Sequence, residues 1–69
     1  MIMNITLNNR PEVIEAGNIT LAGLIELKNF SFRLLVTKVN GKLVRKEERD
    51  GILLKEGDNV IIHHMISGG

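Results

Sequence analysis

The residues with the clearest capacity for chemistry are two glycines, Gly68 and Gly69, with which the sequence closes. Glycine has no Cβ, so an extended tail of this kind can enter a channel too narrow for any side chain. We expect Gly69 to be the C-terminal residue, and its carboxyl group is then ionised at neutral pH. The simplest alternative is a frayed chain end that has no function.

A carboxylate becomes a useful electrophile only when one of its oxygens is converted into a leaving group. ATP can make that conversion by forming an acyl-adenylate, and attack by sulfur on this mixed anhydride leaves a thiocarboxylate. We predict that Gly69 is the residue modified in this way. The residues expected to enter a partner's active site with it are Gly68, Ser67 and Ile66.

No other group of side chains has the spacing of an active site. The chain has no cysteine, which excludes thiolate chemistry, and its 7 glycines are scattered rather than gathered in a phosphate-binding loop. His63 and His64 are adjacent, and neighbouring strand residues point to opposite faces of a sheet. One imidazole should therefore be partly buried and the other solvated, without a shared metal ion. We predict no catalytic residue, no metal and no bound cofactor.

The bulk composition predicts one small globular domain with an aliphatic core. The chain has 69 residues, of which 43% are hydrophobic and 3% aromatic. The net charge of +1 argues against nucleic acid as a partner, since phosphate binding needs a concentrated basic surface. We expect no membrane span and no signal peptide, and the absence of cysteine suits a reducing compartment. We therefore expect a cytoplasmic protein.

The first half of the sequence predicts a hairpin followed by a helix. Apolar and polar residues alternate over residues 3–7, as in a strand with one buried face. Asn8-Asn9 suits a tight turn, and Pro11 makes the returning strand at 10–16 an edge strand. Thr20 can cap a helix that ends near Asn29. The expected apolar stripe of that helix includes Leu21, Leu24, Ile25 and Leu27.

The second half predicts three more strands, at residues 34–39, 42–44 and 59–66. Asn40-Gly41 favours a two-residue hairpin turn, because both positions of such a turn need a positive φ. Gly57-Asp58 favours another turn, and residues 52–54 should re-enter the core. The charged segment 45–51 is expected to be a solvated loop with local ion pairs; the alternative is a patch that docks a partner.

This order of elements predicts an α+β fold of the β-grasp, or ubiquitin-like, type. We expect a mixed sheet of four to five strands with one main helix packed on one face, and the first and last strands parallel at its centre. Residues 1–66 would form the domain and 67–69 a flexible tail. In the last strand we expect Val60 and Ile62 in the core. The opposite side would offer His63 and Met65 as a possible partner interface.

Three segments resemble the ThiS sulfur carriers of thiamine biosynthesis. They are Val39-Asn40-Gly41-Lys42-Leu43-Val44, Leu54-Lys55-Glu56-Gly57-Asp58-Asn59-Val60 and the ending Ile66-Ser67-Gly68-Gly69. The first half also fits, with Ala16-Gly17 followed by Thr20 and a leucine-rich helix. The sequence departs from many ThiS proteins after the fourth strand. There it has Arg45-Lys46 and Arg49 in place of Pro-Arg and an aromatic residue.

The resemblance implies a carrier that partner enzymes modify, and not an enzyme. An adenylating enzyme of the ThiF/MoeB type would use ATP to activate Gly69, and a sulfur relay fed by a cysteine desulfurase would form the thiocarboxylate. Thiazole synthase would accept the sulfur, and the carrier would be monomeric when free. Alternatives are a sulfur carrier for molybdopterin or another pathway, a ubiquitin-like protein modifier, and a binding module without tail chemistry.

Overall fold

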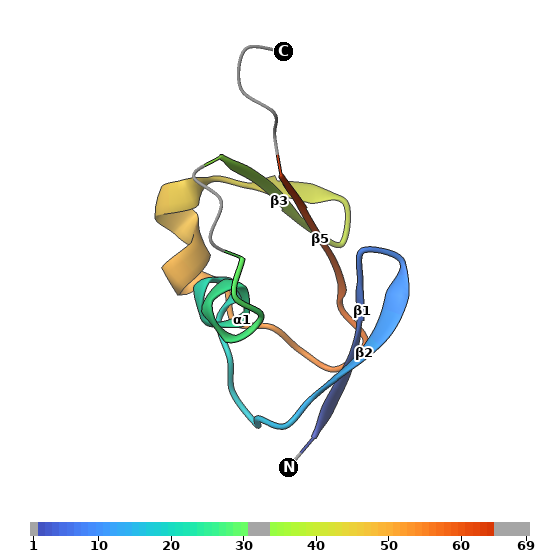
Figure 1. The fold of residues 1–69 in the computed structure, drawn as a ribbon. Coiled ribbons are helices and arrows are strands. Elements are labelled where there is room, and N and C mark those ends of the chain that lie inside the picture. Colours follow the sequence, from blue (N-terminus) through green and yellow to red (C-terminus); the bar gives the residue numbers. More distant parts are fainter. Residues whose placement is uncertain (1, 31–33, 65–69) are drawn as a thin grey trace.

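The computed structural model describes residues 2–30 and 34–64 of the chain. Five strands form one sheet in the order β2-β1-β5-β3-β4 (Figure 1). The strands are β1 (Met3–Leu7), β2 (Arg10–Ile14), β3 (Leu35–Val39), β4 (Lys42–Val44) and β5 (Asn59–His64). The pair β1–β5 is parallel and the other pairs are antiparallel. The predicted α+β, β-grasp architecture is confirmed, with β2 as an edge strand and β5 in the middle.

The helix α1 (Leu21–Leu27) lies over one face of the sheet (Figure 1). Alternate strand residues point to this face, because successive side chains of a strand point to opposite sides. Together with the helix they form an aliphatic core, so the fold needs few aromatic residues to fill its interior. The buried core residues are Met3, Ile5, Leu7, Ile14, Leu21, Leu24, Val44, Leu54, Val60 and Ile62.

Local signals in the sequence fix both ends of α1. The hydroxyl of Thr20 accepts a hydrogen bond from the backbone N–H of Gly23 at 3.0 Å, which confirms Thr20 as the N-cap. At the other end Asn29 takes a left-handed φ of 59°. The backbone N–H of Asn29 donates to Glu26 and that of Phe30 donates to Ile25, which is the Schellman pattern.

Two leucines that were predicted to be buried are exposed. Leu27 is 56% exposed, because α1 buries only the narrow stripe of Leu21 and Leu24 against a small sheet. Leu53 is 51% exposed, because residues 52–54 are extended and only alternate side chains point inward. Leu54 is the inward residue of this segment and is 2% exposed.

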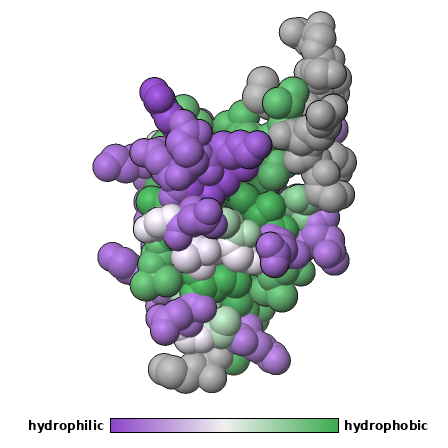
Figure 2. Space-filling view, turned by 90° about the vertical axis from the view of Figure 1, so that its left-hand side faces the viewer, coloured by the Kyte–Doolittle hydropathy of each residue, from purple (hydrophilic) through white to green (hydrophobic). Residues whose placement is uncertain are grey.

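The charged segment after β4 is also more ordered than the predicted solvated loop. Residues Lys46–Gly51 form a 3-10 helix, η1, whose start is closed by the Glu48 carboxylate accepting from the backbone N–H of Arg45. No ion pair is found within η1 as the structure describes it; the ion pair between Lys28 and Glu12 joins α1 to β2 instead. Hydrophilic residues gather on the upper part of the side that carries η1 (Figure 2).

Candidate functional site

The predicted tail, residues 67–69, lies outside the described residues. So do the predicted site residues Met65 and Ile66, which precede the tail. The predicted domain boundary after Ile66 lies there too. The structure describes the strand that presents this tail as far as His64. The described part of the candidate site consists of β5 and the side chains that hold it.

The two faces of β5 differ as predicted. Val60 is 0% exposed and Ile62 is 3% exposed, and both belong to the core beneath α1. His63 lies on the opposite, open face and is exposed, and its role at a partner interface stays a prediction. His64 is exposed as well, so the prediction that one imidazole is partly buried is wrong. No group of side chains suited to a metal ion occurs among the described residues.

The pair β3–β5 extends beyond its flanking strands toward the start of the tail. Strand β5 pairs with β3 from Val39↔Val60 to Leu35↔His64, but its pairing with β1 ends at Leu7↔Val60. On the other side, the pairing of β3 with β4 ends at Thr37↔Val44. The last part of β5 is therefore in a two-stranded ribbon, and such a ribbon has little stability of its own.

Asn8 continues the β1 side of this ribbon where β1 ends. Its backbone N–H donates to the carbonyl oxygen of Val60 at 2.9 Å. Its side-chain Oδ1 accepts from the backbone N–H of Ile62 at 2.8 Å. Asn8 has a φ of 52° and is followed by Asn9 at 67°, which confirms the predicted turn. The same residue thus closes the first hairpin and gives Ile62 an acceptor.

On the β4 side of the ribbon, Arg49 bonds to β3 where β4 ends. Its Nη2 donates to the carbonyl oxygen of Leu35 at 2.8 Å, beyond the last residue of β4. Its Nε donates to Oγ1 of Thr37 at 3.2 Å, and that hydroxyl donates to the carbonyl oxygen of Val44 at 2.7 Å. Thr37 is 0% exposed. The guanidinium therefore joins η1 to the part of β3 that pairs with the end of β5.

A second hairpin asparagine holds the start of β5. Asn40, at a φ of 52°, donates its backbone N–H to the carbonyl oxygen of Asn59 at 2.7 Å. Its Oδ1 accepts from the backbone N–H of Asn59 at 2.9 Å, and its Nδ2 donates to Asp58 at 3.0 Å. Gly57, with a φ of 86°, makes the predicted turn before the strand. Both hairpin turns thus contribute an asparagine to β5.

The open face of the sheet carries an apolar patch beside His63. Across the strands, Leu43 of β4 pairs with Lys38 of β3, which in turn pairs with Ile61 of β5. In the next row Val36 pairs with His63. Leu43 is 62% exposed, and Val36 and Ile61 are partly exposed. We call Val36, Leu43, Ile61 and His63 the open-face patch.

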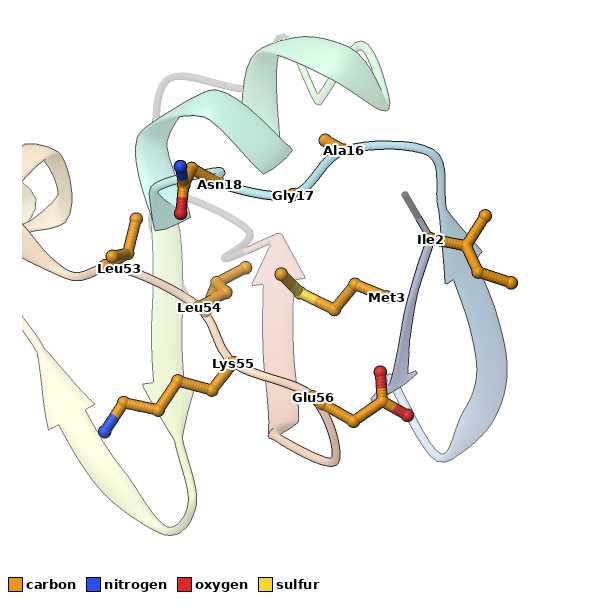
Figure 3. Close-up of a pocket in the computed structure, with 9 residues that line it drawn as sticks. All are labelled: Ile2, Met3, Ala16, Gly17, Asn18, Leu53, Leu54, Lys55 and Glu56. Carbon is orange, nitrogen blue, oxygen red and sulfur yellow. The ribbon is translucent and has the colours of Figure 1, made fainter.

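A shallow cavity of about 410 Å³ lies around the first residues of β1 and the segment before β5 (Figure 3). Its floor is apolar, with the side chains of Met3 and Leu54 pointing toward one another. None of the predicted site residues lines it. Glu56, at its edge, accepts hydrogen bonds from the backbone and side chain of Asn4. These two hydrogen bonds join the start of β1 to the segment before β5.

Sequence reasoning found the turn asparagines but missed what their side chains bind. It also missed the contacts of Arg49. A detectable signal was the pair of Asn-containing turns, Asn8-Asn9 and Asn40-Gly41, at the ends of two separate hairpins. The bond from Ile62 to Asn8 spans 54 positions of the chain, so no local pattern reports it.

Comparison with known proteins agrees with this architecture. A model of the ThiS family matches residues 3–69. The fold is similar to the crystal structure of the thiamine biosynthesis protein (ThiS) from Geobacter metallireducens, at 25% identity and a TM-score of 0.86, covering 97% of this chain and 100% of that one. It is also similar to an NMR solution structure of a thiamine biosynthesis protein from the same organism, at 28% identity and a TM-score of 0.78, covering 97% and 88% of the chains. No curated protein matches the sequence.

Proposed function

The chain belongs to the ThiS family, and from this premise we propose that it is a sulfur carrier of thiamine biosynthesis that works through the carboxyl group of Gly69. The observation that carries the proposal is the family match over residues 3–69, which includes the glycine pair that follows the last strand. A carrier needs a rigid body and a slender end, and this chain combines a packed β-grasp core with two glycines at its close.

The proposed chemistry has two steps, and the partner enzymes supply the catalytic groups. First, an oxygen of the Gly69 carboxylate attacks the α-phosphorus of ATP, pyrophosphate leaves, and an acyl-adenylate forms. Second, a sulfide sulfur attacks the carbonyl carbon and AMP leaves with the bonding electrons, so that a thiocarboxylate remains after loss of a proton. ATP is thus a substrate of the activating partner and not a cofactor of this chain.

The partners follow from the same chemistry. An adenylating enzyme of the ThiF/MoeB type would receive the tail, and a thiazole synthase would accept the sulfur. The open-face patch would contact the adenylating partner, because it includes His63 of the strand that leads into the tail and exposes apolar side chains. No helix of the described residues is long and apolar enough to cross a membrane.

The test is an intact mass measurement of a protein that ends at Gly69. The chain is incubated with an adenylating enzyme of the ThiF/MoeB type, ATP and sulfide. We expect a mass gain equal to the replacement of one oxygen by sulfur, located by fragmentation at Gly69. The matched control carries one additional alanine after Gly69, which retains the fold and blocks the carboxyl group, and it should gain no mass.

Two results would argue for other functions. If no adenylating enzyme encoded next to the gene for this protein supports the exchange of oxygen for sulfur, the sulfur-carrier proposal is contradicted. Conjugates of higher mass in a cell lysate, lost when Gly69 is deleted, would indicate a protein modifier instead. In that case the tail would still be activated, but a lysine amine and not sulfide would attack it.

A further inference from the structure

We propose that Asn8 and Arg49 are positioning residues that fix the direction in which β5 presents the tail to the adenylating partner. This inference rests on the proposed function, since it concerns the same tail. The reacting carboxyl group belongs to Gly69, whereas the side chains of these two residues bond to Ile62 and Leu35. Asn8 and Arg49 act through the β3–β5 ribbon that precedes the tail.

The β3–β5 ribbon needs support where its neighbouring strands end. The pairing of β1 with β5 stops at Val60, and the pairing of β4 with β3 stops at Thr37, while β3 and β5 remain paired up to Leu35↔His64. In a sheet, each strand fixes the direction of the next through backbone hydrogen bonds. A ribbon without neighbours on either side twists and bends more easily.

On each side of the ribbon, one side chain takes the place of the strand that has ended. The backbone N–H of Ile62 points toward the β1 side and donates a hydrogen bond to Oδ1 of Asn8 at 2.8 Å. The Nη2 of Arg49 reaches the carbonyl oxygen of Leu35, which points toward the β4 side, at 2.8 Å. The ribbon is therefore held on both sides within two residues of its last described pair, Leu35↔His64.

Asn8 and Arg49 are themselves fixed in place by further hydrogen bonds. Asn8 sits in a two-residue turn with φ of 52° at Asn8 and 67° at Asn9, and its backbone N–H is bonded to Val60. Arg49 is partly buried, and its Nε is bonded to the fully buried Thr37. A group held by several bonds orients its partner better than a mobile surface side chain does.

Binding of the partner and alignment of the tail in its active site would then depend on different parts of the molecule. The open-face patch would determine how tightly the partner binds, whereas Asn8 and Arg49 would determine how often the bound carrier has its carboxyl group aligned with ATP. A misplacement of about 1 Å at a reacting group can slow a reaction by about a hundredfold. Loosening the ribbon should therefore lower kcat of adenylation and leave KM almost unchanged.

The experiment uses substitutions that remove the side-chain hydrogen bonds of Asn8 and of Arg49. Asn8→Gly removes the acceptor and tolerates the positive φ, and Asn9→Gly is its matched control in the same turn. Arg49→Met removes the guanidinium, and Lys46→Met is the control that removes one positive charge from the exposed surface of η1. Asn8→Asp retains an acceptor oxygen and should restore the behaviour of the parent chain.

Two readouts are measured for each variant. In Asn8→Gly, amide hydrogen exchange at Ile62 should accelerate about tenfold relative to Asn9→Gly, because that N–H loses its acceptor. In both Asn8→Gly and Arg49→Met, kcat of tail adenylation should fall about tenfold or more, with a KM change below about threefold. The two controls and Asn8→Asp should stay close to the parent chain in both readouts.

Three other outcomes would contradict the proposal. Unchanged exchange at Ile62 in Asn8→Gly would show that the Asn8 side chain does not hold the ribbon. Faster exchange with an unchanged kcat would show that the two residues serve stability alone and would overturn the positioning role. A parent chain that no adenylating partner accepts would defeat the proposed function and the positioning role with it, whereas the exchange data would still decide whether Asn8 holds the ribbon.

Discussion

Single residues in this fold carry strong local requirements that can be tested separately from function. Gly41 has a φ of 83° in the β3–β4 turn, a conformation in which a Cβ is strained. Gly51, at the end of η1, has open space around the position of a Cβ and no such φ. We predict that Gly41→Ala lowers the free energy of unfolding by about 1–2 kcal/mol. Gly51→Ala should change it by less than about 0.5 kcal/mol.

Urea denaturation of the two alanine variants measures this difference directly. Because both substitutions add the same methyl group, any general effect of alanine is shared between them. An equal shift of the two midpoints would show that the turn does not require a left-handed residue at position 41.

The buried hydroxyl of Thr37 is a second residue with a defined role. It donates to Val44 and accepts from Arg49, so Thr37→Val removes both of these side-chain hydrogen bonds. We predict a loss of about 1–3 kcal/mol in the free energy of unfolding, the range for an unsatisfied buried polar group. The losses from Thr37→Val and Arg49→Met should be less than additive in the double variant, because both remove the same bond. Full additivity would mean that the two side chains stabilise the fold independently.

At the scale of elements, α1 stabilises the fold through a narrow face. Leu24 is 0% exposed in the core, whereas Leu27, three positions later, is 56% exposed. We predict that Leu24→Ala lowers the free energy of unfolding by about 2–5 kcal/mol, which is a large share of the stability of so small a domain. Leu27→Ala should cost less than about 1 kcal/mol. Thermal unfolding followed by circular dichroism compares them, and similar losses would contradict the packing described here.

The hairpins show how one element can serve two neighbours. The β1–β2 and β3–β4 turns each begin with a left-handed asparagine, and each asparagine also bonds to β5. The middle strand is thus held at its start by Asn40 and near its end by Asn8. This arrangement explains how a short sheet can hold β5 firmly although β1 pairs with only its first two residues.

At the scale of the whole molecule, the sheet has one covered face and one open face. If the open-face patch binds the adenylating partner, a charge at its exposed leucine should weaken the complex. We predict that Leu43→Asp raises the Kd about tenfold or more, as expected for an apolar side chain that an interface would bury. Leu27→Asp places the same charge at a similarly exposed leucine on the helix side and should leave the Kd unchanged.

Isothermal titration with the adenylating enzyme measures both constants. Equal Kd values for Leu43→Asp and the parent chain would exclude the patch as the docking surface. Equal weakening by the two variants would point to a general charge effect instead. Circular dichroism of both variants checks that the fold is retained.

The sequence by itself determined the local structure and the order of the elements. Alternation over residues 3–7 fixed a strand, Thr20 fixed the start of the helix, and Asn40-Gly41 fixed a turn. These signals are reliable because φ preferences, caps and side-chain alternation depend on neighbouring residues alone. The order of strands and helix then left the β-grasp as the natural closure, and the glycine pair is the basis of the chemistry that we propose for the tail.

Only the tertiary structure decided which side chains are buried and which of them contact a neighbouring element. Leu27 and Leu53 match the apolar pattern, but both are exposed. The helix α1 buries only a narrow stripe against a small sheet, and the extended segment 52–54 points only alternate side chains inward. The contacts of Asn8 with Ile62 and of Arg49 with Leu35 depend on where β1 and β4 end relative to β3 and β5. Register and strand length arise from packing across the whole chain, so a periodicity read over a few residues does not contain them.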